Sequence, residues 1–217
     1  MIYCTDVDLL HWEPDIFRDA AFASQLQLAG TGDLSGTAFT LDTGSLTDAH
    51  VMAHQVIVLS GTVAGSYPIV SIDGAAQLTL SVMYDGLYPE SGPIVPGPVG
   101  TAIDLAYAVR TFWPQRQVVS DLLTRAAGIG PETGAAASAQ IINTQALRRP
   151  CALGTLQMIY SALAAAAAEP AKFSARADLY ERLYRRALAQ TRLHLDLDGD
   201  GREDAVRLLS VLKLKRA

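Results

Sequence analysis

The spacing of hydrophobic positions changes twice along the chain. From Asp6 to Leu28 apolar residues recur at helical spacing, and Gly30 and Gly32 then follow as helix stops. From Leu34 onward, short segments rich in Val, Ile, Thr and Tyr alternate apolar and polar residues, which is the period of half-buried strands. The predicted strands are 37–42, 55–60, 67–73, 77–82 and 102–112. Five strands so close together favour a small antiparallel barrel or sandwich.

The helical period returns after the last of these strands. Three helices are expected: one from Pro114 to Gly128, one from near Asn143 or Pro150 to Ala168, and one N-capped by Ser174. The alanines at the end of the second helix would let a neighbouring backbone approach closely, because their side chains are small. We therefore expect this helix to be central in the helical part of the protein.

The C-terminal segment changes to alternation again. Leu193, Leu195 and Leu197 alternate with polar residues, a Gly-Asp-Gly turn follows, and a returning strand is expected over 206–215. That last segment is too apolar for a free tail, so we expect it to bind a partner chain by adding a strand to a sheet; the alternative is that it completes a sheet within its own subunit. The expected partner-binding residues are Leu208, Leu209, Val211, Leu212 and Leu214.

These patterns together predict an α+β protein. Its main part would be an α-helical bundle, discontinuous in sequence, made of residues 1–30 and 113–192. Residues 31–112 would form a small antiparallel β-module inserted into that bundle, and residues 193–217 a C-terminal β-hairpin and docking segment.

Composition adds an expectation of self-association. Half of the residues are hydrophobic and only 18% are charged, which suggests that apolar surface is buried against other chains.

No apolar run reaches the length of a membrane span, and no secretory signal begins the chain, so we expect a protein made in the cytosol without a membrane partner. The net charge of -5 argues against sequence-independent binding of DNA. Cys4 and Cys151 lie far apart in sequence and are expected to be two reduced thiols.

An acidic stretch near the C-terminus is the clearest chemical motif. Its carboxylates occupy positions 1, 3, 5 and 9 of a loop, and they belong to Asp196, Asp198, Asp200 and Asp204. Gly201 at position 6 permits the bend of a calcium-binding loop, but Arg207 stands at position 12, where an EF-hand has a bidentate Glu. The alternative is an Asp- and Gly-rich turn whose side chains accept hydrogen bonds from nearby backbone amides. Calcium is therefore a candidate ligand, and no other cofactor is indicated.

The remaining polar residues form no recognisable catalytic set. His50 and His54 are four apart, but no Glu follows His50 as in a zinc-protease helix. His11 and His194 lack a matching nucleophile or carboxylate arrangement. The glycine pairs lack the Lys-Ser/Thr of a phosphate loop. We therefore expect no catalytic residues and no enzyme activity.

The order of the segments resembles that of a known family. The segments are Leu34-Ser-Gly-Thr37, Val56-Ile-Val-Leu59, Tyr67-Pro-Ile-Val-Ser71, Leu78-Thr-Leu-Ser-Val-Met-Tyr-Asp85, Val109-Arg-Thr-Phe-Trp-Pro-Gln115, Ala152-Leu-Gly-Thr-Leu156 and the Asp-rich terminal hairpin. In this order they resemble the head-to-tail adaptor (connector) proteins of tailed bacteriophages. The resemblance covers most of the chain, and its strength lies in the order, since each segment alone occurs in many β-modules.

The resemblance implies a structural virion protein of the bacteriophage neck, made in the host cytoplasm. It implies an oligomeric ring of roughly twelve copies that joins the portal protein to tail or nozzle proteins. Such a ring would form part of the DNA exit channel, where DNA passes without sequence-specific binding. Two alternatives remain: another phage neck or tail-completion protein, and a calcium-dependent binding module.

Overall fold

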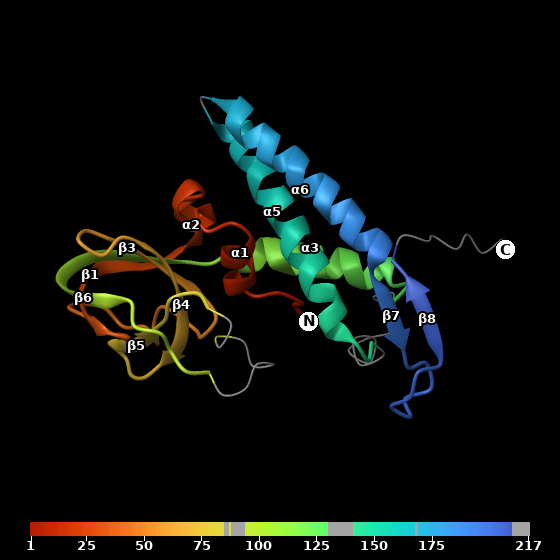
Figure 1. Ribbon diagram of the computed structural model, residues 1–217, viewed down its shortest axis with the longest axis horizontal. Coiled ribbons are helices and arrows are strands. Elements are labelled where there is room, and N and C mark those ends of the chain that lie inside the picture. Colours follow the sequence, from red (N-terminus) through yellow and green to blue (C-terminus); the bar gives the residue numbers. More distant parts are fainter. Residues whose placement is uncertain (85–86, 88–93, 130–140, 168, 210–217) are drawn as a thin grey trace. The chain divides into compact units, whose positions relative to one another are not determined.

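The computed structural model describes residues 1–84, 87, 94–129, 141–167 and 169–209 (Figure 1). Its contacts divide the chain into two compact units. The first, here the barrel unit, comprises Asp6–Phe112, and the second, here the helical unit, comprises Met1–Thr5 together with Trp113–Ala217. Each unit has its own core, so the two are described in turn.

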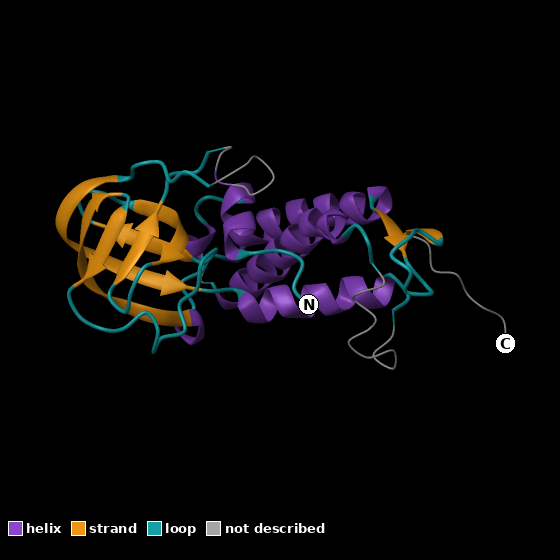
Figure 2. Ribbon diagram, turned by 90° about the horizontal axis from the view of Figure 1, so that it is seen from below, coloured by secondary structure: helices purple, strands orange, loops and turns teal. Residues whose placement is uncertain are grey.

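Six antiparallel strands form a closed barrel in the barrel unit (Figure 2). They are β1 (Leu26–Gly36), β2 (Ala38–Leu41), β3 (Val56–Ser60), β4 (Gly65–Ile72), β5 (Gln77–Leu80) and β6 (Gly100–Arg110). The order around the barrel is β1-β2-β5-β4-β3-β6, and β6 pairs with β1 to close it. The predicted fold class, a helical bundle carrying a small β-module, is therefore wrong. The β part is a complete barrel that encloses its own apolar core.

The barrel closes through β1, whose first part was predicted to be the end of a helix and the glycines that stop it. Gly30 and Gly32, interpreted as helix stops, lie within β1 and pair with β6. A Cβ atom at Gly32 would stand 2.4 Å from the backbone oxygen of Thr40 and 2.8 Å from the ring of Phe39. Glycine is required at this position because the neighbouring backbone approaches it so closely.

The interior of the barrel is filled by side chains from every strand. Alternate residues point inward, as the two-residue period of a strand requires. The buried side chains include Leu34, Phe39, Ile57, Leu59, Ile69, Leu78, Leu80, Leu105, Tyr107 and Val109. The rings of Phe39 and Tyr107 meet edge to face with their centroids 5.4 Å apart.

The opening helices belong to the barrel unit and not to the helical unit; of residues 1–30, all of which were predicted to join the later helices, residues 1–5 do so. They are α1 (Asp6–Trp12) and α2 (Ile16–Asp19), followed by the short 3-10 helix η1 (Ala23–Gln25). Helix α1 contacts β3 and β4, and α2 contacts β3. Phe17 is fully buried, and its ring lies 5.0 Å from that of Phe112, just beyond β6. This aromatic contact buries the apolar side of α2 against the end of the barrel.

A buried carboxylate ties α1 to the same place. The side chain of Asp6 accepts a hydrogen bond from the Thr111 hydroxyl at 2.7 Å and another from the Phe112 backbone N–H at 3.0 Å. The Val7 N–H also donates to the carbonyl of His54 at 3.3 Å. Because a buried charge needs such donors, α1 is fixed to the barrel by polar as well as apolar contacts.

Three longer helices, a short 3-10 helix and a two-stranded sheet are found in the described part of the helical unit. The elements are α3 (Trp113–Ala126), η5 (Thr144–Leu147), α5 (Arg148–Ala166), α6 (Pro170–Gln190), β7 (Arg192–Leu195) and β8 (Ala205–Leu208). Helices α5 and α6 run side by side (Figure 1). A Cβ atom at Gly154 of α5 would lie 2.9 Å from Val119 of α3 and 3.0 Å from the ring of Tyr184 of α6. The missing side chain therefore lets three helices approach one another.

An aromatic contact fixes the pairing of α5 with α6. The rings of Tyr160 and Tyr180 are stacked, with centroids 5.7 Å apart, and Arg176 donates to the Tyr160 hydroxyl at 2.7 Å. Helix α6 begins at Pro170, so Ser174, predicted as its N-cap, lies inside the helix and donates to the Pro170 carbonyl. The alanines that end α5 are mostly exposed, whereas burial is continuous from Pro150 to Leu156 and continues at Ile159, Tyr160 and Leu163. Among the described helices none is both long and apolar enough to cross a membrane.

Candidate functional site

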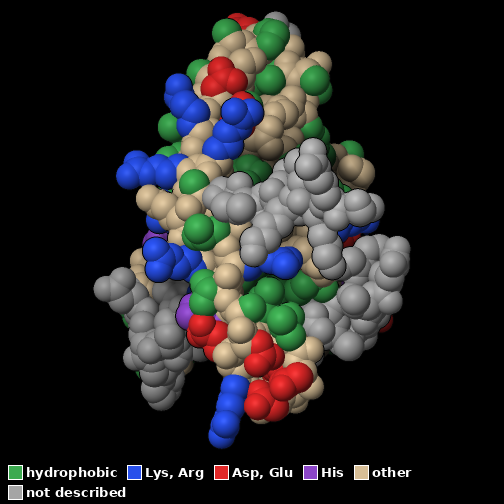
Figure 3. Space-filling view, turned by 90° about the vertical axis from the view of Figure 1, so that its right-hand side faces the viewer, with side chains coloured by type: hydrophobic (Ala, Val, Ile, Leu, Met, Phe, Trp, Pro, Cys, Tyr) green, Lys and Arg blue, Asp and Glu red, His purple; other side chains and the backbone are tan. Residues whose placement is uncertain are grey.

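The candidate site lies in the hairpin formed by β7 and β8 and by the acidic loop between them, residues 196–204. Leu193 and Leu195 of β7 are buried, whereas Val206 and Leu208 of β8 are exposed. Acidic side chains gather at the tip of this hairpin (Figure 3). The hairpin thus offers two distinct surfaces, an acidic tip and a partly apolar strand.

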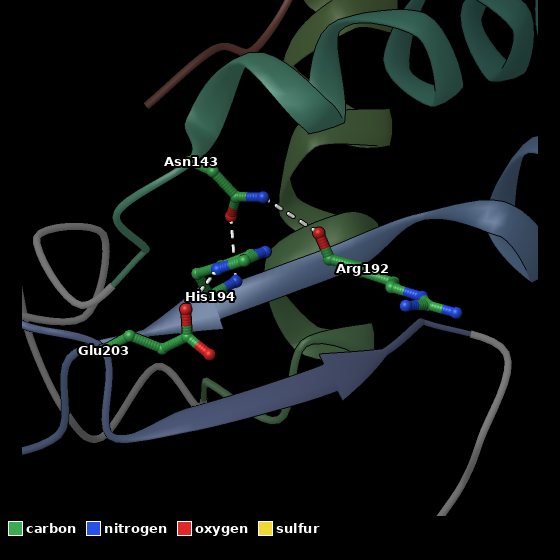
Figure 4. Close-up of polar contacts among 4 residues, drawn as sticks. All are labelled: Asn143, Arg192, His194 and Glu203. Carbon is green, nitrogen blue, oxygen red and sulfur yellow. Dashed lines mark hydrogen bonds and ion pairs between the residues drawn. The ribbon is translucent and has the colours of Figure 1, made fainter.

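The amide side chain of Asn143 makes two hydrogen bonds to the backbone of β7 (Figure 4). Asn143, just before η5, accepts a hydrogen bond from the His194 N–H at 2.8 Å and donates to the Arg192 carbonyl at 2.9 Å. The Ile142 N–H donates to the His194 carbonyl at 2.9 Å, so the outer edge of β7 is occupied. On the other side, the His194 ring nitrogen lies 2.5 Å from a carboxylate oxygen of Glu203. The start of β7 is therefore tied to the segment before α5.

Strand β8 contacts the residue that follows α3. The guanidinium of Arg207 donates to the carbonyl of Ala127, just beyond the end of α3. Carbonyls at a helix C-terminus lack partners within the helix, and a cation satisfies them well. This contact accounts for the Arg at position 12 of the acidic motif, where an EF-hand would have a metal-binding Glu.

Backbone amides of the acidic loop converge on Asp196. Its two carboxylate oxygens accept hydrogen bonds from the N–H of Gly199 at 2.6 Å and of Gly201 at 2.8 Å. Both glycines have positive φ, at +83° and +82°, a conformation that side-chain-bearing residues rarely adopt. The two glycines let the loop curl around the carboxylate.

The other carboxylates of the loop also accept backbone amides. Asp204 accepts from the N–H of Leu197 at 2.7 Å and of Asp198 at 3.3 Å. Asp198 accepts from the N–H of Asp200 at 3.2 Å, and Asp200 from that of Arg202 at 2.8 Å. This is the hydrogen-bonded turn that was the alternative to a calcium loop.

Three of the four predicted metal ligands also lie close together. One carboxylate oxygen from each of Asp196, Asp198 and Asp204 lies within 4.8 Å of the others, whereas Asp200 is not part of this cluster. Oxygen ligands bind calcium at 2.3–2.6 Å, so two ligands on opposite sides of one ion are about 5 Å apart. The spacing would fit a calcium ion, and binding of calcium stays a prediction because exposed acidic groups often gather without one.

The pKa of Asp196 is lowered from its ordinary value. The main cause is the hydrogen bond from the Gly201 N–H, and the Gly199 N–H adds to it, whereas desolvation acts in the opposite direction. Asp196 therefore stays ionised to lower pH than an unperturbed aspartate. An ionised side chain is the form that both accepts the loop amides and could bind a cation.

The predicted partner-binding residues fall into three groups. Leu208 is partly exposed on β8, whereas Leu209 is buried in its own unit and its N–H donates to the Thr191 carbonyl at 3.3 Å. The other three, Val211, Leu212 and Leu214, lie outside the described residues. Val206, not among the predicted residues, is the more exposed apolar side chain of β8 at 53%.

A scan of the sequence against protein-family models found no match, and searches of curated proteins and of solved structures found none either.

Proposed function

We propose that this protein is a structural subunit of a bacteriophage particle, a head-to-tail adaptor that forms a ring between the portal and the tail. The order of sequence segments is the starting point of this proposal. In the proposal the protein catalyses no reaction, and its hairpin is the part that binds the portal protein. The helical unit would form the wall of the ring.

The observation that carries the proposal is the outer edge of β8. The sheet of the hairpin has the order β7-β8, and within the described part of the chain no further strand pairs with β8. An edge strand with free backbone groups is a template for a strand from another chain. Val206 and Leu208 are exposed on this strand and would give such pairing its register. The partner to which we assign this edge is a strand of the portal protein.

Exposed apolar side chains on two helices support self-association. Val118 and Leu122 lie one turn apart on α3 and are each about half exposed, at 47% and 50%. On α6, Leu179 is 43% exposed. Apolar side chains repeated on one helix face are suited to contact with a neighbouring subunit. We assign these side chains to contacts between copies in the ring.

The overall charge suits a passage for DNA. A net charge of -5 provides little of the electrostatic attraction to phosphates that supports non-specific binding. Packaged DNA could therefore move past the ring without being retained. This fits the expectation of a channel component and not of a DNA-binding protein.

Co-sedimentation with isolated portal complexes tests the assignment of β8. We expect Val206→Lys to weaken binding at least tenfold, because a charge at an apolar edge position opposes strand addition. The matched control is Ile103→Lys in the barrel unit, which replaces a 79% exposed apolar residue and should leave binding unchanged. Circular dichroism would verify that both variants keep the wild-type fold.

Two results would reject the proposal. If the wild-type protein does not sediment with portal under any condition in which it is folded, it is not a portal-binding adaptor. If it binds isolated tails instead, it is a tail-completion protein. Equal binding by wild type and Val206→Lys would show that β8 is not the docking strand.

A further inference from the structure

Two cysteines that are 147 residues apart in sequence meet inside the helical unit. The sulfur atoms of Cys4 and Cys151 are 2.7 Å apart, which is only about 0.7 Å more than the length of a disulfide bond. Both side chains are buried, at 3% and 0% exposure. The prediction of two separate reduced thiols did not foresee this contact. The pair is placed for a covalent bond.

The chain around Cys4 is held in place by α3. The Cys4 carbonyl accepts a hydrogen bond from the buried guanidinium of Arg116 at 2.8 Å. The N–H of Tyr3 donates to the Ser120 hydroxyl at 3.2 Å, and the Tyr3 hydroxyl lies 2.8 Å from that of Thr124. These contacts fix the backbone on both sides of the Cys4 side chain, so its sulfur has little freedom to move away from its partner.

The neighbourhood of Cys151 is equally ordered. Its sulfur lies 3.3 Å from the Ser120 hydroxyl, and its carbonyl accepts a hydrogen bond from Thr155 at 2.8 Å within α5. The pKa of Cys151 is lowered, first by the hydrogen bond with Cys4 and further by Ser120, although burial acts against this. A larger thiolate fraction makes a cysteine a better nucleophile at neutral pH.

We propose that Cys4 and Cys151 form an intramolecular disulfide when the protein meets a peroxide oxidant. The thiolate of Cys151 attacks one oxygen of hydrogen peroxide, which gives a sulfenic acid and, after protonation, one water. The thiol of Cys4 then attacks the sulfenic sulfur, forms the S–S bond and releases a second water. Two thiols lose two electrons and two protons, and the peroxide is reduced to two waters.

Hydrogen peroxide is the oxidant chosen because both thiols are buried. Access of a small neutral molecule to buried groups needs a smaller local opening than access of a bulky disulfide does. In a reducing cytosol the pair stays as thiols, and in an oxidising medium it becomes a disulfide. This inference rests on the geometry of the pair and does not depend on the proposed function.

The bond would link the start of the chain to α5. The loop that it closes contains the whole barrel unit, because the chain leaves the helical unit after residue 5 and re-enters it at residue 113. Cross-links across long loops restrict the unfolded chain most. We therefore expect oxidation to raise the melting temperature of the helical unit by an amount on the order of 10 °C.

Counting of free thiols tests the inference. The full-length protein is purified under reductant, exposed to hydrogen peroxide, denatured and treated with a mass-tagged maleimide. We expect two tags on the reduced protein, none after oxidation, and two again after dithiothreitol. Peptide mass spectrometry should find the Cys4 and Cys151 peptides joined and lighter by two hydrogen atoms. The single-thiol variants Cys4→Ala and Cys151→Ala should keep one tag when reduced and should not gain stability on oxidation.

Three results would overturn the inference. They are retention of two tags by the oxidised protein, covalent dimers in place of an internal bond, and loss of tags that dithiothreitol does not reverse. The melting temperature is compared within each variant, so a weaker fold of an alanine variant does not affect the comparison. Should neither variant fold, the masses of the wild-type peptides still decide.

Discussion

Replacement of Asp6 by alanine should destabilise the barrel unit, because this buried carboxylate joins α1 to the end of β6. It accepts hydrogen bonds from the Thr111 hydroxyl and from the Phe112 N–H. A hydrogen bond to a charged group contributes about 1.5–3 kcal/mol, so we expect Asp6→Ala to lower the free energy of unfolding by about 3 kcal/mol or more. Asp6→Asn should cost roughly half as much, because its oxygen can still accept the Phe112 N–H while the Thr111 hydroxyl turns to accept from the amide.

The two tryptophans allow the units to be followed separately. Trp12 belongs to the barrel unit and Trp113 to the helical unit. Urea unfolding monitored by fluorescence would use a Trp113→Phe background to report the barrel and a Trp12→Phe background to report the helices. We expect Asp6→Ala to lower the midpoint reported by Trp12 more than that reported by Trp113. A change below about 0.5 kcal/mol at Trp12 would refute the role given to Asp6.

Further predictions concern the barrel closure and the acidic loop. Gly32→Val should cost about 3 kcal/mol or more in urea unfolding, because its side chain would collide with the neighbouring backbone, whereas Gly74→Ala, in open space, should change stability by less than about 1 kcal/mol. Since the pKa of Asp196 is lowered in the folded protein, its contribution to hairpin stability is complete above the ordinary aspartate pKa of about 3.9 and is lost as pH falls through the lower folded value. Protection of the loop amides against hydrogen exchange, relative to an unfolded peptide at the same pH, should fall over that range, and Asp196→Asn should remove this pH dependence. The double variant Asp198→Ala with Asp200→Ala should weaken the hairpin in thermal unfolding. If calcium is bound, a chelator should lower the melting temperature of the wild type and leave that of the double variant unchanged; no effect on either would leave the loop as a hydrogen-bonded turn alone.

Strands in which buried and exposed residues alternate regularly could be predicted from the sequence, whereas β1, which lacks this alternation, could not. In β6, Leu105, Tyr107 and Val109 are buried at every second position, so the period of two marked this strand. In β1, glycines occupy positions where a helix could equally end. The reason for Gly32 is its contact with Thr40 on the neighbouring strand, which local sequence does not reveal. Without β1 the barrel could not be seen to close.

The acidic loop could be predicted from the sequence, whereas the distant residues that hold the hairpin in place could not. Its carboxylates are close in sequence and regularly spaced, so a turn from Asp196 to Asp204 could be predicted. Asn143 holds β7 from 51 residues away, and Cys4 meets Cys151 from 147 residues away. No local pattern predicts a contact between such distant residues. The assignment of the opening helix to the barrel depended on Asp6 and Phe112, which are also distant in sequence.

Electron microscopy of the purified protein mixed with isolated portal complexes tests the proposed function most directly. We expect an additional ring of density on one face of the portal, with the symmetry of an oligomer of roughly twelve copies. The ring should be absent when Val206→Lys replaces the wild type. Portal particles that look the same with and without the folded protein would contradict the proposal.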